Sequence, residues 1–563
     1  MSAIPLGQYL FTRLKQLDVG TVFGAPGDFN LSLLDHLYNV PDMCWAGSTN
    51  ELNGGYAADG YARIRRLGAI VTTFGVGELS AINALAGAYS EHVGVVHIVG
   101  YPSTSAQDSK RMIHHTLGNG DFRAFHRMSS EVSIVSHVLD DIEKAPGQID
   151  DALRAAYVHQ RPVYLGIPSN FADMDVPSDL LSAPIDLSLE SNPTHAEKEV
   201  LSRVVELINK AQRPVILVDA FAVRHGVGNE TRQFADKTNF PVFATPTGRS
   251  IVDETNPRFG GIYIGFLSNP DVKAVVETAD LVLSIGPMPS DFNTASFSYE
   301  FSTDNVVEFH FDHTTVCSMD YGGVKMAHLL PRLSEKLTSK ELAKPLVPVP
   351  SIPTDVPSVK STDPINHEWL WPRLSGWLRP GDILLSESGT SHFGTLRTKL
   401  PSGAAAITSF MWAAIGYTVG AAFGAAMAAR DVGDDRRVVL FVGDGSLQMT
   451  ATEVSSMVRW GLKPYIFVIN NDGYTVERLI HGERQTYNDL HMWQYTKMVD
   501  LYNAKQGEAH LVESTADLES LFSSNDFSEA SKFRVIEVKM PLMDAPSNIK
   551  MQTAKMAAAN AKK

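Results

Sequence analysis

The feature that most constrains the fold is an alternation of short apolar, β-branched runs with segments of helical periodicity. It recurs in three successive stretches of the chain. Strands that alternate with helices pair in parallel, because each helix returns the chain to the same edge of the sheet. The sequence therefore predicts an α/β fold with three mostly parallel sheets, each flanked by helices.

Each stretch contains four candidate strands, bounded by turn-forming residues. In the first stretch they are 21–24, 69–74, 95–100 and 162–167. In the second they are 214–219, 241–244, 281–285 and 306–311. In the third they are 383–386, 437–442, 465–470 and 534–539.

Chain length and two Pro-rich segments predict where the domains begin and end. A chain of 563 residues exceeds one hydrophobic core, since cores stop growing at roughly 250–300 residues. Segment 344–364 is dense in proline and predicts an extended linker, and 177–195 is rich in Pro, Ser and Asp. We expect domains at 1–182, 190–343 and 365–563, with 344–364 linking the last two.

Charge and cysteine content exclude several classes of function. The net charge is −15 and no Lys/Arg-rich run is present, which argues against a nucleic-acid partner. Two cysteines, Cys44 and Cys317, cannot build a disulfide framework and fit a reducing compartment. No secretory signal is visible at the N-terminus. We therefore expect a cytoplasmic protein.

Residues 409–429 carry no charge and place Gly416, Gly420 and Gly424 at a four-residue spacing. This spacing imitates the packing face of a membrane helix. The segment is only weakly hydrophobic and lacks an aromatic belt at one end. We expect a small-residue helix buried between other elements, and no membrane partner.

Two neighbouring strands of the third stretch end in polar turns. The strand before Asp444 runs into Gly443-Asp444-Gly445-Ser446, and the next strand runs into Asn470-Asn471-Asp472-Gly473. A helical stripe of Val454, Met457 and Val458 separates them, and Gly461 suits the position after the helix end.

This βαβ unit predicts a metal and phosphate site. It brings Asp444 and Asn471 to the carboxyl ends of parallel strands, where open α/β sheets bind ligands. One carboxylate, one amide oxygen and the carbonyl of Gly473 form a donor set typical of Mg²⁺. Gly445 and Ser446 open the following helix, so their N–H groups can face a diphosphate.

The two turns together resemble the thiamine diphosphate motif of one enzyme superfamily, and the resemblance extends along nearly the whole chain. The segments similar to yeast-type pyruvate decarboxylases are 6–11, 21–30, 50–53, 114–122, 290–294, 459–465 and 543–546. The family implies a pyrimidine-binding domain at 1–182, a middle, regulatory domain at 190–343 and a diphosphate-binding domain at 365–563. It also implies a homodimer with cofactor sites shared between subunits, and a homotetramer built as a dimer of dimers.

The resemblance implies a function. We expect non-oxidative decarboxylation of a 2-oxo acid, pyruvate to acetaldehyde and carbon dioxide, through the ylid and enamine of thiamine diphosphate. Such an enzyme is a carboxy-lyase of alcoholic fermentation that needs thiamine diphosphate and Mg²⁺.

The family also assigns site residues to matching positions. Glu51 would contact the pyrimidine nitrogen, Ile415 would press the cofactor into its bent shape, and the carbonyl of Ala413 would contact the aminopyrimidine. Thr390 belongs to the same cofactor site. The matching catalytic set, besides Glu51, is Asp28, His114, His115 and Glu477. Histidine titrates near neutral pH, and a desolvated Glu can be raised into that range.

Substrate-pocket positions match the yeast pattern only in part. The implied pocket is Asp28, His115, Phe292, His392, Val476, Glu477 and Ile480. Val476 stands where isoleucine is usual, His392 where alanine is usual, and Ala413 where glycine is common. Phe221 occupies a position where some members have a cysteine proposed as a regulatory substrate site. Phenylalanine cannot act as a thiol, which puts such activation in doubt.

Three other functions stay open. A decarboxylase for phenylpyruvate, indolepyruvate or branched-chain 2-oxo acids would share the catalytic residues and differ in the pocket. A flavin-binding carboligating synthase is disfavoured by the His114-His115 pair. A catalytically inactive, cofactor-binding regulator is disfavoured by the intact Glu51, Asp444, Asn471 and Glu477.

Overall fold

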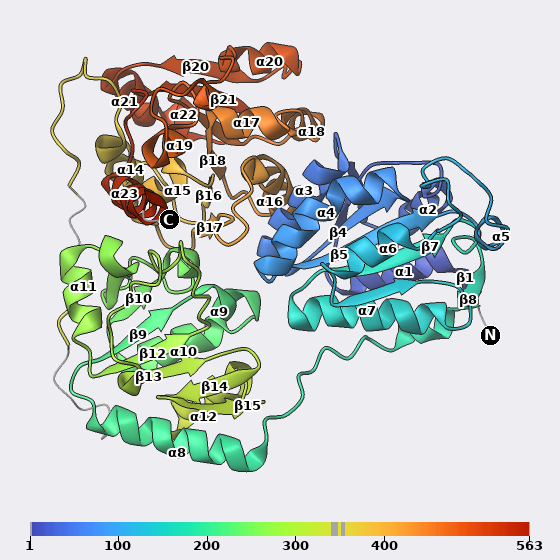
Figure 1. Cartoon of the computed structure of the whole chain (residues 1–563), viewed down its shortest axis with the longest axis horizontal. Coiled ribbons are helices and arrows are strands. Elements are labelled where there is room, and N and C mark those ends of the chain that lie inside the picture. Colours follow the sequence, from blue (N-terminus) through green and yellow to red (C-terminus); the bar gives the residue numbers. More distant parts are fainter. Residues whose placement is uncertain (1–2, 339–346, 351–354, 562–563) are drawn as a thin grey trace.

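The computed structural model describes residues 3–338, 347–350 and 355–561, and it contains three large sheets flanked by helices (Figure 1). The α/β fold class is confirmed. The expected linker at 344–364 lies in part outside the described residues. The exact domain boundaries stay a prediction.

The first sheet has six parallel strands in the order β3-β2-β4-β5-β7-β6. Its strands are β2 (Thr21–Gly24), β3 (Cys44–Gly47), β4 (Leu67–Thr73), β5 (Gly94–Tyr101), β6 (Val135–Val138) and β7 (Val163–Pro168). All four expected strands are present. The two unexpected strands, β3 and β6, are short half-exposed edges, so they lack a continuous apolar run.

Helices cover both faces of this sheet (Figure 1). They are α1 (Leu6–Gln16), α2 (Leu31–Asp35), α3 (Glu51–Arg65), α4 (Val76–Ser90), α5 (Thr104–Asp108), α6 (Ala124–Ser130) and α7 (Ala145–His159). A small antiparallel pair, β1 (Ala3–Pro5) and β8 (Asp175–Pro177), closes the domain, because it joins the beginning and the end of this stretch.

The middle sheet has seven strands in the order β11-β10-β9-β12-β13-β14-β15. They are β9 (Pro214–Val218), β10 (Val242–Ala244), β11 (Phe259–Ile262), β12 (Leu281–Ile285), β13 (Val306–Phe309), β14 (His313–Val316) and β15 (Met319–Gly322). Its helices include α8 (Thr194–Lys210), α9 (Ala220–Arg224), α10 (Gly228–Thr238), α11 (Pro270–Glu277) and α12 (Met326–Lys336). Strands β14 and β15 add an antiparallel edge.

The third sheet has six parallel strands in the order β17-β16-β18-β19-β21-β20. They are β16 (Ile383–Ser386), β17 (Ala405–Ile407), β18 (Val438–Gly443), β19 (Tyr465–Asn470), β20 (Glu508–Val512) and β21 (Arg534–Lys539). Its helices are α14 (His367–Ser375), α15 (Thr390–Thr395), α16 (Tyr417–Asp431), α17 (Asp444–Thr450), α18 (Glu453–Arg459), α19 (Thr475–Ile480), α20 (Met498–Leu501), α21 (Thr515–Ser523), α22 (Asn525–Ser528) and α23 (Ser547–Ala561).

Helix α16 is the buried small-residue helix expected from 409–429, although it begins only at Tyr417. Within the described ranges, no helix is long and apolar enough to cross a membrane. Instead α16 packs on α3 and joins the first domain to the third (Figure 1).

Glycines make this close approach of α3 and α16 possible. A Cβ on Gly424 would lie 1.8 Å from the carbonyl oxygen of Ala57, and one on Gly60 would lie 2.2 Å from that of Ala421. Both obstacles are backbone atoms, which cannot move aside without shifting a helix. The spacing that imitates a membrane packing face therefore serves a contact between two domains.

Gly424→Ala should destabilise the protein strongly, because its methyl group meets backbone at 1.8 Å. Overpacking a tight interior costs about 1–3 kcal/mol, and a backbone obstacle places this variant at the upper end. Gly147→Ala is the matched control, since nothing lies within 4 Å of its Cβ position in α7. Urea unfolding of both variants measures the difference. Equal stability of the two would contradict the packing argument.

Candidate active site

The predicted metal site lies at the carboxyl ends of two adjacent strands. β18 and β19 pair in parallel, with Gly443 opposite Ile469. Asp444 follows β18 as the first residue of α17, and Asn471 follows β19. Both side chains are buried, with 2% and 5% of their surface exposed. The structure thus brings the two proposed ligands together by strand pairing.

The Asp444 carboxylate has no cationic partner among the described residues. It accepts hydrogen bonds from the backbone N–H groups of Gly445 (2.7 Å) and Gly473 (3.0 Å). Burial raises the pKa of Asp444 to about 6 despite these bonds. A buried carboxylate without a counter-charge is costly, and a divalent cation compensates that cost directly. The residues present therefore fit a metal ion.

Glycines allow the two turns that carry Asp444 and Asn471 to curve tightly. Gly473 has a φ of +119°, and a Cβ there would lie 2.5 Å from the carbonyl oxygen of Asn488. A Cβ on Gly445 would lie 2.5 Å from the ring of Tyr474. Side chains at these positions would force the turns apart, so the tight backbone curve needs glycine. This leaves backbone N–H groups near Ser446 for a diphosphate.

Glu51 opens helix α3, which Asn50 caps by accepting a hydrogen bond from the backbone N–H of Asn53. Burial raises the pKa of the half-buried Glu51 carboxyl. A Cβ on Gly77 would lie 3.0 Å from Oε1 of Glu51, so glycine leaves space beside the carboxylate. No side-chain hydrogen bond or ion pair to Glu51 is found among the described residues. The carboxylate is therefore available to a ligand.

Asp28, His114 and His115 form a cluster on the first domain. Nε2 of His114 lies 2.7 Å from Oδ2 of Asp28, and the His114 ring stacks on Phe29 at 5.0 Å. Ligand-type atoms of all three residues lie within 4.8 Å of one another. Asp28 and His114 are exposed and His115 is half-buried, so the cluster faces outward from this chain. The arrangement suits proton relay between an imidazole and a carboxylate.

The segment predicted to contact the cofactor, 409–416, precedes α16. Ala413 has a left-handed φ of +54°, which explains why glycine is common there and costs an alanine about 1 kcal/mol. Ile415 follows with 38% of its surface exposed, so it is free to press on a ligand. Thr390 is buried at the start of α15.

Two buried glutamates hold this segment, and sequence reasoning missed both. Oε1 of Glu91 accepts hydrogen bonds from the backbone N–H groups of Phe410 (2.6 Å) and Met411 (2.7 Å). Glu387 accepts bonds from the hydroxyl of Thr418 (2.6 Å) and the N–H of Gly416 (3.2 Å). For Glu387 the only available signal was its place directly after an apolar strand, and no local pattern marks Glu91.

Three of the substrate-pocket candidates, Phe292, His392 and Val476, belong to one aromatic and aliphatic cluster. Phe292 packs 5.8 Å from Phe410, and the buried His392 packs 4.0 Å from the same ring. Val476 belongs to this cluster and lies beside Gly389. Glu477 and Ile480 lie on the same short helix, α19, with Glu477 exposed. His392 therefore packs behind Phe410 in this cluster.

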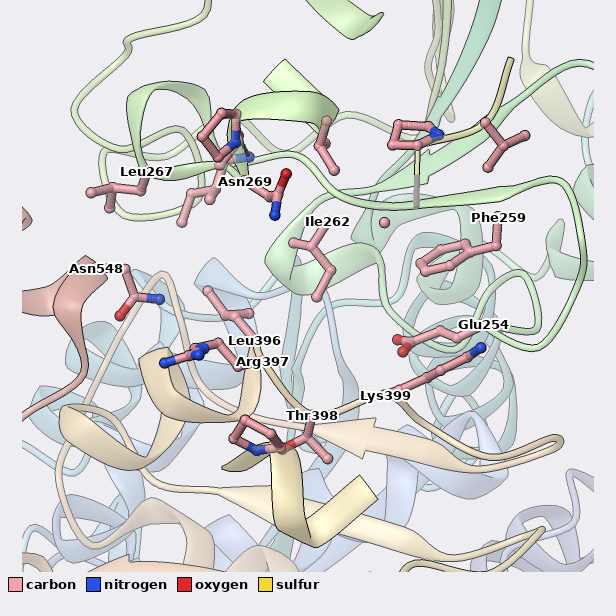
Figure 2. Close-up of a pocket in the computed structure, with 18 of the residues that line it drawn as sticks. Glu254, Phe259, Ile262, Leu267, Asn269, Leu396, Arg397, Thr398, Lys399 and Asn548 are labelled. Carbon is pink, nitrogen blue, oxygen red and sulfur yellow. Dashed lines mark hydrogen bonds between the residues drawn. The ribbon is translucent and has the colours of Figure 1, made fainter. Parts of the chain in front are cut away.

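The predicted site residues fall into two groups within one chain. Asp28, Glu51, His114 and His115 belong to the first domain, and the metal and pocket groups belong mainly to the third. No hydrogen bond or ion pair in the described part of the chain joins the two groups. A separate cavity of about 770 Å³ lies between the middle and third domains and contains none of these residues (Figure 2).

Phe221 fills its position with aromatic contacts. Its ring lies 4.2 Å from that of His92 and 5.6 Å from that of Phe311, and His225 stacks on Phe311 at 4.2 Å. The four rings form a packed cluster between the first and middle domains. Within the described chain this position is therefore an apolar contact between domains.

Comparisons with known sequences agree with this geometry. The thiamine pyrophosphate enzyme profiles match in order: the N-terminal TPP binding domain at residues 4–124, the central domain at 201–326 and the C-terminal TPP binding domain at 388–538. The chain therefore belongs to the thiamine pyrophosphate enzymes, whose cofactor is also called thiamine diphosphate. The cofactor prediction is confirmed.

Within this class the chain is similar to yeast pyruvate decarboxylases. It is 52% identical over 562 residues to pyruvate decarboxylase of Kluyveromyces lactis, covering 100% of both chains. It is also 52% identical to pyruvate decarboxylase isozyme 2 of Saccharomyces cerevisiae over 565 residues, again covering 100% of both. The Candida albicans pyruvate decarboxylase is 52% identical over 98% of both chains. The family resemblance read from the motifs is confirmed.

The buried Glu387 predicts a pH dependence of stability. Burial raises its pKa from 4.5 to about 7, so between these values the unfolded carboxyl ionises and the folded one stays protonated. The free energy of unfolding should therefore fall as pH rises through this window, by about 3 kcal/mol for this group. Glu387→Gln should reduce the slope, measured by urea unfolding from pH 5 to 7.5.

Glu513→Gln, at an exposed position, is the control and should keep the wild-type slope. Glu78→Gln tests a second case, because burial also raises the pKa of Glu78 to about 7. A Glu387→Gln slope identical to that of the wild type would contradict the assignment.

Proposed function

We propose that the protein catalyses the thiamine diphosphate- and Mg²⁺-dependent decarboxylation of pyruvate to acetaldehyde and carbon dioxide. The observation that carries the proposal is the uncompensated Asp444 carboxylate at a strand end, in a chain 52% identical over its full length to a pyruvate decarboxylase. It would act as a carboxy-lyase of alcoholic fermentation. The half-buried free cysteines, Cys44 and Cys317, support a cytoplasmic location.

When bound, the cofactor supplies the nucleophilic carbon and the electron sink for decarboxylation. Asp444, Asn471 and the carbonyl of Gly473 would hold Mg²⁺. The N–H of Ser446 would bind the diphosphate, and Gly445, whose own N–H donates to Asp444, would border it. These groups sit on paired strand ends, so their spacing is fixed before any ligand binds. Preformed ligands of this kind lose little entropy on binding.

The organic part of the cofactor would meet residues from both halves of the site. The free carboxylate of Glu51 would bind the pyrimidine nitrogen. The carbonyl of Ala413 would accept a hydrogen bond from the amino group, and the exposed Ile415 would press the two rings into a bent shape. Thr390 would border the same site.

The remaining site residues would transfer protons. One proton must reach the carbon from which carbon dioxide leaves, and another must leave the hydroxyl that becomes the aldehyde. We assign these transfers to Glu477 and Asp28, with His114 and His115 as orienting and relay groups. The 2.7 Å contact between His114 and Asp28 supports the relay.

The two separate groups of site residues favour a homodimer. One chain would supply Asp28, Glu51, His114 and His115, and its partner would supply the metal and pocket residues. Large apolar side chains are exposed near Ile415: Met411 (50%), Trp412 (42%) and Met449 (54%), the last beside Gly416; Val76 (54%) is exposed at the start of α4. Exposed apolar patches of this kind mark association surfaces. A dimer of dimers is the assembly implied by the family.

Val476 favours a second class of substrate, larger 2-oxo acids. It stands where isoleucine is usual, so the pocket gains the volume of one methylene. Such a change alters discrimination by only about 1–3 kcal/mol, which permits some turnover of larger 2-oxo acids without excluding pyruvate. Decarboxylation of phenylpyruvate, indolepyruvate or a branched-chain acid is therefore the alternative function.

A coupled aldehyde assay with a panel of 2-oxo acids tests the function. Pyruvate should have the highest kcat/KM, phenylpyruvate should be slower, and omission of Mg²⁺ or thiamine diphosphate should abolish turnover. A higher kcat/KM for phenylpyruvate than for pyruvate would instead support the alternative function, decarboxylation of larger 2-oxo acids. Bound cofactor with no carbon dioxide released from any acid would instead identify an inactive, cofactor-binding regulator.

Mixing inactive variants tests the shared site. Glu51→Gln and Glu477→Gln should each lower kcat by about 10²-fold or more, as expected for positioned acid–base groups. After the two variants are dissociated and reassembled together, mixed dimers should recover activity, because one of their two sites contains no substitution. Glu51→Gln mixed with Asp28→Asn is the control and should recover none, since both residues belong to the same half. Recovery in both mixtures, or in neither, would contradict the arrangement.

A further inference from the structure

Beyond the catalytic residues, a small enclosed cavity lies where the middle and third domains meet. Its volume is about 20 Å³. A cavity of roughly 10–15 Å³ on this measure already holds one water-sized particle. The polar side chains that line it are Arg224, Thr247, Arg249, Ser386, His392, Thr395 and Thr408, and the other lining residues are Pro246, Leu384, Ala406 and Ile407.

Several of the polar groups already have partners. Arg249 pairs with Glu254 at 2.8 Å, and its remaining N–H groups bind the carbonyls of Thr395 and Thr398. The hydroxyl of Thr247 binds Asp219 at 2.6 Å. The hydroxyl of Thr395 binds the carbonyl oxygen of His392 at 2.7 Å. These side chains therefore complete the wall without needing a ligand.

Three side chains do not have partners for all their polar atoms. Nε of Arg224, Nε2 of His392 and Oγ1 of Thr408 are buried and have no hydrogen-bond partner in the described part of the chain. Buried polar atoms without partners are costly, and each such atom in a native structure needs an explanation. Three of them around one cavity point to a bound particle that satisfies all three.

All three orphaned groups can donate a hydrogen bond. Arg224 donates through Nε–H, and the hydroxyl of Thr408 can rotate to donate. Burial lowers the pKa of His392 to about 3, so the ring is neutral. The Oγ of Ser386 lies 3.4 Å from its Nδ1. A proton donated by that hydroxyl makes Nδ1 the acceptor and leaves Nε2–H as a donor.

The charged side chains that line the cavity are both arginines, and no carboxylate lines it. Arg249 is neutralised by Glu254. Arg224 forms no ion pair with any described residue, although the charges of Asp59 and Glu91, which both bind Arg63, also act on it. Three unpartnered donors around one cavity, a guanidinium among them, favour a small anion, because a water molecule accepts only two hydrogen bonds.

We propose that this cavity binds one monovalent anion of about the size of chloride, through Arg224, His392 and Thr408. The site would connect the middle domain, which supplies Arg224 from α9, to the third domain, which supplies His392 from α15 and Thr408 after β17. Because the His392 ring packs 4.0 Å from Phe410, the anion also fixes the ring behind the aromatic cluster. The proposal does not depend on the catalytic function.

His392 distinguishes this chain from family members that have alanine at the same position. Alanine, which is usual there in the family, has no side-chain donor to offer. His392→Ala therefore removes one of the three anion contacts and introduces the residue that is usual at this position in the family. Thr408→Val removes a second contact at nearly constant volume. His195→Ala, at an exposed position on α8, is the matched control.

Crystals of the full chain grown or soaked in bromide, which substitutes for chloride, test the site directly. An anomalous bromide peak bounded by Arg224, His392 and Thr408 is expected in the wild type. A water molecule refined at this position with no bromide signal would overturn the proposal.

Thermal unfolding in chloride against gluconate, at matched ionic strength, gives an independent measurement in solution. Chloride should raise the Tm saturably in the wild type and in His195→Ala. In His392→Ala and Thr408→Val the half-saturating chloride concentration should rise by about tenfold or more, because each variant loses a charge-assisted hydrogen bond. An unchanged chloride response in both variants would overturn the proposal, even if one of them folds poorly.

Discussion

The packing of α3 against α16 is the contact on which the remaining geometry depends. Glycines on both helices let the two backbones touch, and this contact joins the first domain to the third. Glu51 is the first residue of α3, and Ile415 comes two residues before α16. Two predicted cofactor contacts thus lie at the ends of the two helices that pack most closely. Any displacement of one helix would move a site residue with it.

Buried charge is the second organising constraint. In the core of this contact, Arg63 binds both Asp59 and Glu91, so each of these carboxylates has a cationic partner within the chain. Asp444 and Glu51 differ, because no cation among the described residues compensates either carboxylate. Burial raises the pKa of both. The fold accepts this cost at the positions where a metal ion or a protonated pyrimidine would remove it.

The middle domain contacts the other two domains through aromatic side chains. Phe221 packs among His92, His225 and Phe311, so the position of a proposed regulatory cysteine is an aromatic contact between domains. Phe292 reaches the aromatic cluster of the third domain from the opposite side. Substitutions in this domain would therefore act on the pocket by shifting its walls, since none of the proposed acid–base groups belongs to it.

The fold class and twelve strands could be predicted from the sequence alone, because apolar runs and turns are local patterns; the metal donors stay a prediction from the strand-end turns. The sequence also identified the family, because long motifs occur in one order. Short edge strands such as β3 and β6 escaped prediction, since they carry little apolar signal. The folded structure was needed to show that the glycines at 416–424 pack on α3, that Glu91 and Glu387 bind the segment before α16, and that His392 lies behind Phe410. These are contacts between residues far apart in the chain, and no local pattern encodes a partner that folding alone brings near.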